Sequence, residues 1–123
     1  MEKAIEVYKK AISINPDDAE AHNNLGIAYG ESGMNKEAID ALKQAIRIDP
    51  DDAESHYNLG LAYGESGMNK EAIDAFKQAI RINPDFAEAH TNLGVTYGKS
   101  GMYEEAIESC KQAIRINPDF AEA

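Results

Sequence analysis

The sequence predicts an all-α fold, a solenoid of stacked helix pairs, and three features carry this prediction. A segment of 34 residues occurs three times in succession, and 28 of its 34 positions are identical in the first two copies. Each copy contains two stretches with apolar residues at helical spacing. Glycine and proline stand at fixed positions between and after these stretches. Because one such unit cannot bury its own apolar face, neighbouring units have to stack around a continuous core.

The repeat also predicts the domain organisation. Residues 1–18 match the second half of a unit, and residues 121–123 begin a further one. We therefore expect residues 1–123 to form a single solenoid of about seven helices, one unpaired helix followed by three pairs. The full units span residues 19–52, 53–86 and 87–120.

The first helix of each unit is expected to run from about Ala19 to Ser32. Asp17 and Glu20 form an Asp-x-x-Glu pattern at its start, a variant of the capping box in which the aspartate caps the helix. We expect Gly33 to end the helix, because glycine readily adopts the left-handed conformation found at helix C-termini. The same pattern occurs in the next two units.

The second helix of each unit is expected to run from about Lys36 to Ile48. Its apolar face is formed by residues at helical spacing, among them Ala38, Leu42 and Ala45. A proline two residues after the helix stops it, since the residue before a proline disfavours the helical conformation.

Charge and composition exclude several classes of function. The chain has 22 Asp and Glu against 12 Lys and Arg, a net charge of −10, which argues against nucleic acid or an anionic membrane surface as partner. No apolar run approaches the ~20 residues that cross a bilayer. With one cysteine and no phosphate loop, zinc spacing or nucleophile–base pair, we expect no enzyme, cofactor or metal. Nothing resembles a signal peptide, so we expect a cytoplasmic protein.

Several signature positions recur at the same offsets in all three units, and in the first they are Leu25, Gly26, Tyr29, Ala38, Ala45 and Pro50. In this pattern and its period the whole chain resembles the tetratricopeptide repeat family, including long arrays such as that of protein O-GlcNAc transferase. The resemblance implies a right-handed superhelix whose first helices line the concave face and whose second helices line the convex face. It also implies a protein-interaction module that binds an extended or helical peptide segment in the concave groove.

A periodic asparagine is the first candidate for ligand binding. Asn24, Asn58 and Asn92 each precede the Leu-Gly pair of a first helix. A similar asparagine lines the inner surface of the long arrays of the family, where it forms a ladder that binds a peptide backbone. An amide side chain offers a donor and an acceptor, so it can pair with a peptide group of any sequence. The alternative is that these asparagines only bond to their own helix or to the next.

The other groove candidates vary between units or carry charge. Side chains that differ between units on a repeated scaffold suit a binding surface, although residues at exposed positions also change by neutral drift. The residues are Asn23, Tyr57 and Thr91, then the apolar Ile27, Leu61 and Val95, and finally Glu31 and Glu65. We expect Glu31 and Glu65 to face the groove and to favour a partner with a basic segment, although Lys99 reverses the sign in the last unit. Glycines at positions 30, 64 and 98 either leave room for a ligand backbone or mark an early end of the helix.

His22, His56 and His90 occur once per unit, and packing or capping is the favoured interpretation over metal binding or pH sensing. Equivalent positions lie about 8–10 Å apart across packed helices, whereas zinc lies ~2 Å from each nitrogen, so the three cannot share an ion. Cys110 stands where the other units have Leu42 and Phe76, and we expect it to be a small buried apolar residue. We expect core packing for Tyr29, Tyr63 and Tyr97.

Two alternatives to a peptide-binding module remain open. The chain could be a structural spacer or a self-associating scaffold, because the uncapped terminal helices would expose apolar side chains and allow a homo-oligomer. It could also be the substrate-recruiting segment of a larger enzyme. The residues expected to be exposed at the two ends are Ile5, Tyr8, Ile107, Cys110 and Ile114.

Overall fold

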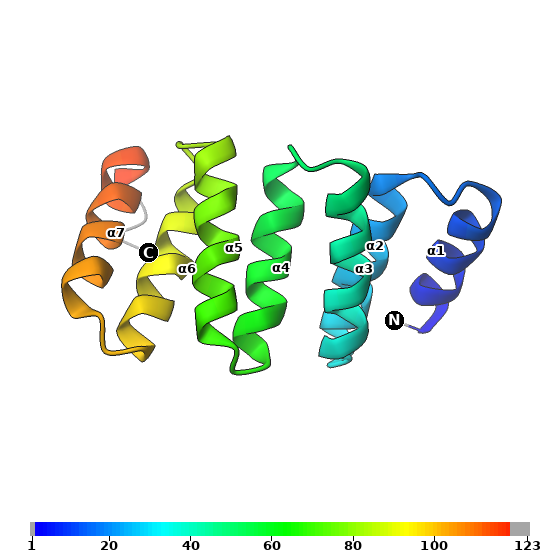
Figure 1. Cartoon of the computed structure of the whole chain (residues 1–123), viewed down its shortest axis with the longest axis horizontal. Helices are drawn as coiled ribbons and strands as arrows, with labels where there is room; N and C mark the ends of the chain where they lie inside the picture. The colour runs from blue at the N-terminus through cyan, green and yellow to red at the C-terminus, as the bar shows by residue number, and fades with distance from the viewer. Residues whose placement is uncertain (1, 119–123) are drawn as a thin grey trace.

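The structure is a computed structural model of the chain and describes residues 2–118. Over these residues it contains seven helices and no strand. They are α1 (Glu2–Ile14), α2 (Ala19–Glu31), α3 (Asn35–Ile48), α4 (Ala53–Glu65), α5 (Asn69–Ile82), α6 (Ala87–Lys99) and α7 (Tyr103–Ile116). The helices follow one another in chain order along the molecule, from α1 at one end to α7 at the other (Figure 1).

The predicted all-α repeat fold is confirmed, and the predicted helix bounds in the first unit are correct to within one residue. The glycine that separates the two helices of each unit has a positive φ, for example 76° at Gly33, as a left-handed helix terminus requires. The predicted start of a further unit at residues 121–123 lies outside the described residues.

The helices form two layers with different contacts. Each helix packs against its neighbours in the chain, and in addition α2 contacts α4 and α4 contacts α6. Over residues 2–118, the helices of the other layer, α1, α3, α5 and α7, make no such contacts with one another. The layer of α2, α4 and α6 is therefore the more tightly curved, inner side of the solenoid, and it forms the concave face.

The core runs continuously through the stack because small residues let the helices approach. Ala38 and Ala45 on α3 are fully buried, and Leu42 between them is 1% exposed. A Cβ atom added at Gly26 on α2 would lie 2.5 Å from the Cγ of Leu42, so α2 and α3 can pack this closely only with glycine at that position. Tyr29 and its equivalents Tyr63 and Tyr97 belong to this core, as expected.

The predicted capping box is wrong by one residue. The cap of α2 is Asp18, whose carboxylate accepts a hydrogen bond from the backbone N–H of Ala21, and Asp17 lies in the preceding turn. With Asp18 as the cap, Glu20 occupies the second helical position rather than the third, where a capping box needs it. The cap of α6 is Phe86, which has no side-chain acceptor.

The predicted exposure of the chain ends is half right. Ile5 is buried and Tyr8 is half-buried, because their face of α1 packs against α2. The exposed apolar side chains of α1 are instead Val7 and Ile14.

Cys110 is exposed, so the expectation of a small buried residue is wrong, whereas its place among the residues expected to be exposed at the chain ends is confirmed. Leu42 and Phe76 at the equivalent positions are buried because α4 and α6 cover their helices, whereas no described helix follows α7. Ile107 and Ile114 on α7 are exposed, as expected.

Candidate functional site

The concave face carries a row of exposed apolar side chains. Ile27 on α2, Leu61 on α4 and Val95 on α6 stand at equivalent positions and remain 37%, 36% and 50% exposed. Such side chains at regular intervals on the inner layer present an apolar strip to solvent, as a binding surface would.

A hollow of about 390 Å³ opens on this face between α2 and α4. Its lining is mostly apolar, and it brings five of the eleven predicted groove residues together. Those five are Ile27, Glu31, Asn58, Leu61 and Glu65. Asn35, Leu42 and three small residues of α2 and α3 complete the α2–α3 side.

Asn58 is held by the preceding unit. Its Nδ2 donates to the Oδ1 of Asn23 at 3.1 Å, and the hydroxyl of Ser55 donates to the same oxygen at 3.3 Å. Asn23 is buried, so its side chain faces the next helix rather than the groove. Ser55 was not among the predicted groove residues, although a serine there replaces the alanine of the other two units, Ala21 and Ala89.

Asn92 makes the equivalent contact one unit later. Its Nδ2 donates to the hydroxyl of Tyr57 at 3.1 Å and to the backbone carbonyl of Glu88 at 2.9 Å. Both of its N–H groups are therefore used, while its Oδ1 has no donor among residues 2–118. In the asparagine row, Asn24, Asn58 and Asn92, the last two thus bond to the preceding inner helix, and their side-chain oxygens have no donor among residues 2–118.

Tyr57 stands at the position that Asn23 and Thr91 occupy in the other units, and it takes part in these contacts. The ring of Tyr57 lies 4.8 Å from that of Phe86 and 5.8 Å from that of Phe76, measured between centroids. Burial raises the pKa of the Tyr57 phenol above its ordinary value of 10.0, and the nearby carboxylate of Glu88 raises it further, against the opposing hydrogen bond from Asn92. Thr91, at the same position of α6, instead bonds to its own helix, at the carbonyl of Ala87.

The raised pKa of Tyr57 predicts a loss of stability at alkaline pH. The folded chain binds this proton more tightly than the unfolded chain, so the contribution is complete below pH 10 and disappears as the pH rises through the raised pKa. Urea unfolding between about pH 8 and about pH 11 should show a steeper fall in stability for the wild type than for Tyr57→Phe. Equal slopes in the two proteins would show that Tyr57 ionises without a folding penalty.

Three glycines lie on the groove side of the inner helices, and no close contact with another helix requires glycine there. Gly30, Gly64 and Gly98 are helical, and a Cβ atom added at any of them would meet nothing within 4 Å. An early end of the helix does not explain them, because α2 continues to Glu31 and the positive φ occurs only at Gly33. Open space next to the backbone therefore remains on the groove side.

The three histidines tie the loops to the inner helices. The Nε2 atoms of His22, His56 and His90 lie 2.9, 2.9 and 3.0 Å from the carbonyl oxygens of the prolines six residues earlier. The packing interpretation is confirmed. Among residues 2–118, no three His, Cys, Asp or Glu side chains are grouped so that they could hold a metal ion. Nor does any helix in that range have the length and apolar character needed to span a membrane.

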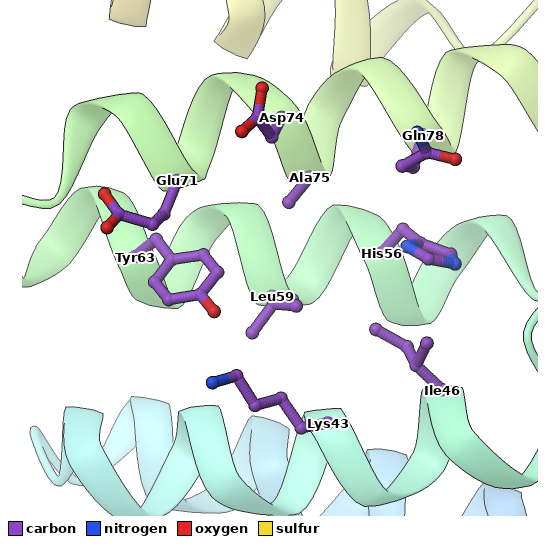
Figure 2. Close-up of a pocket in the computed structure, with 9 residues that line it drawn as sticks. All are labelled: Lys43, Ile46, His56, Leu59, Tyr63, Glu71, Asp74, Ala75 and Gln78. Carbon is purple, nitrogen blue, oxygen red and sulfur yellow. The ribbon is translucent and has the colours of Figure 1, made fainter.

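The opposite face carries a furrow between α3 and α5 of about 310 Å³. Figure 2 shows Leu59 and Tyr63 of α4 lying between Lys43 on one side and Glu71 and Asp74 on the other. The Nζ of Lys43 lies 6.0 Å from the centre of the Tyr63 ring. A basic group faces two carboxylates here, so this furrow lacks the uniform charge of the concave hollow.

Comparison with known proteins agrees with the fold. Models of the TPR repeat match residues 1–33, 28–67 and 63–101, and the tetratricopeptide repeat model matches residues 87–120. A search of curated proteins gave no match.

Solved structures of MamA are similar to this chain. One, described as the crystal structure of MamA, is 34% identical with a TM-score of 0.89 over 97% of this chain and 70% of that one. A second has the same identity and TM-score over 98% of this chain and 66% of that one. A fragment of MamA from Desulfovibrio magneticus RS-1, 23% identical over 96% of this chain and 67% of that one, with a TM-score of 0.89, shows the fold alone. With repeat models that together span nearly the whole sequence, the chain belongs to the tetratricopeptide repeat family.

Proposed function

We propose that the chain is a protein-interaction module that holds an extended or helical segment of another protein in its concave groove. The observation that carries this proposal is the hollow between α2 and α4, where apolar side chains, two amide groups and two carboxylates surround open space. Apolar contacts supply affinity at such a surface, and a few convergent polar groups orient the ligand.

The asparagine row supports a peptide ligand that is recognised through hydrogen bonds to its backbone. The side chain of Asn24 has no hydrogen-bond partner among residues 2–118. The side chain of Asn58 uses one N–H group, and that of Asn92 has only its oxygen left. The three amides can therefore accept N–H groups from a peptide along the whole face, while only the first two can also donate. The exposed glycine backbone beside them leaves space for a peptide chain to approach.

Replacing Asn24, Asn58 and Asn92 together by alanine tests this role. We expect binding of peptides selected on the wild-type chain to fall at least tenfold, since each lost hydrogen bond contributes about 0.5–1.5 kcal/mol. The far-ultraviolet circular dichroism should remain helical. The control changes Lys43, Lys77 and Lys111, which recur on the outer helices, to alanine and should leave binding intact. Undiminished binding by the asparagine variant would remove the ladder from the proposal.

A second candidate function, self-association, rests on α7. Tyr103, Ile107 and Ile114 are 68%, 58% and 44% exposed, and together with Cys110 they form an apolar surface. Exposed apolar surface of this kind favours association with another chain. Sedimentation equilibrium at about 10–500 μM should then detect a dimer that Ile107→Lys abolishes. A strict monomer over that range would contradict this role and leave the groove proposal standing.

A further inference from the structure

We propose that the hollow between α2 and α4 accepts one lysine or arginine side chain from the bound segment. The inference rests on the proposed function, because it assigns a side-chain specificity to the same groove.

The charge of the hollow favours a cation. Glu31 and Glu65 both line it, and the other polar side chains in its wall, Asn35 and Asn58, are neutral. Both glutamates are exposed, and neither carboxylate has a hydrogen-bond or ion-pair partner among residues 2–118. A guanidinium or ammonium group between them would gain two carboxylate partners without displacing a cation of the chain.

The apolar part of the lining suits the stem of the same side chain. Ile27 and Leu61 face the hollow from adjacent inner helices, and Leu42 and Ala62 lie in its wall. Lysine and arginine carry three or four methylene groups that pack on such surfaces while the charged end stays at a polar site. No side chain at Gly30, which also lines the hollow, obstructs the entry.

The next pair of inner helices lacks this charge pattern. Lys99 on α6 stands where α2 and α4 have Glu31 and Glu65, so the α4–α6 pair combines one acid with one base. Asn92, unlike Asn58, has no free N–H group there. The preference for a basic residue is therefore confined to the α2–α4 position, and a bound segment has one register along the groove.

The test begins with selection of random 12-residue peptides on the full 123-residue chain. Selected peptides should share a lysine or arginine at one position, and its replacement by norleucine should weaken binding about tenfold. Glu31→Gln with Glu65→Gln should cause the same loss, because each exposed ion pair contributes up to about fivefold. The loss should shrink as salt is raised, since screening weakens exposed ion pairs.

The matched control is Glu37→Gln with Glu71→Gln, which removes the same charge from the outer helices and should leave affinity unchanged. Lys99→Glu should raise affinity for peptides with a second basic residue. Peptides that bind through the asparagine row but need no basic residue would overturn this inference and leave the proposed function intact. Failure to select any peptide sensitive to the asparagine variant would overturn both.

Discussion

Replacing Phe76 by alanine should lower the free energy of unfolding by about 3–5 kcal/mol, the usual cost of emptying a buried aromatic site. Phe76 is 2% exposed, and its ring packs against α4 beside Gly60 and the ring of Tyr57. The cavity would open in the core where α4 packs on α5. Urea unfolding followed by circular dichroism measures the loss.

Cys110→Ala is the matched control, because Cys110 occupies the position of Phe76 in the next unit but is exposed. Its effect should stay within about 0.5 kcal/mol, as for most surface substitutions. Similar losses in the two variants would mean that the burial seen at Phe76 does not control stability.

Gly60→Ala should destabilise the chain by about 1–3 kcal/mol, because it overpacks the contact between α4 and α5. An added Cβ atom would lie 2.6, 2.7 and 2.9 Å from three atoms of the Phe76 ring. The ring is rigid and buried, so it can make room only by moving other core side chains.

Gly64→Ala, one turn later on the same helix, should have the opposite sign. A Cβ atom there would meet nothing within 4 Å, and alanine should stabilise the helix by about 0.5–1 kcal/mol. Thermal unfolding of the two variants beside the wild type measures the difference. A loss of stability for Gly64→Ala would show a contact at that position that the structure does not contain.

The helices could be predicted from the sequence because their signals are local. Apolar spacing, the positive-φ glycine and the following proline act within a few residues, and they placed the first-unit helices to within one residue. Capping is equally local, but it depends on which residue directly precedes the helix. The turn after Pro16 includes Asp17 and delays the helix start, so Asp18 takes the cap.

The candidate site was less predictable, because its contacts join residues about 35 positions apart. The bonds from Asn58 to Asn23 and from Asn92 to Tyr57 depend on how far successive units rotate and shift. The periodicity of a sequence does not specify how far each unit rotates relative to the one before it. For the same reason Cys110 looked equivalent to Leu42, although burial at this position requires a helix on the far side of its own.

A crystal structure of the chain with a selected peptide would show where the ligand binds. We expect the peptide to cross α2, α4 and α6, with N–H groups bonded to Asn24, Asn58 and Asn92 and a basic side chain between Glu31 and Glu65. A peptide lying in the outer furrow beside Lys43 and Glu71, or on the exposed face of α7, would contradict this expectation.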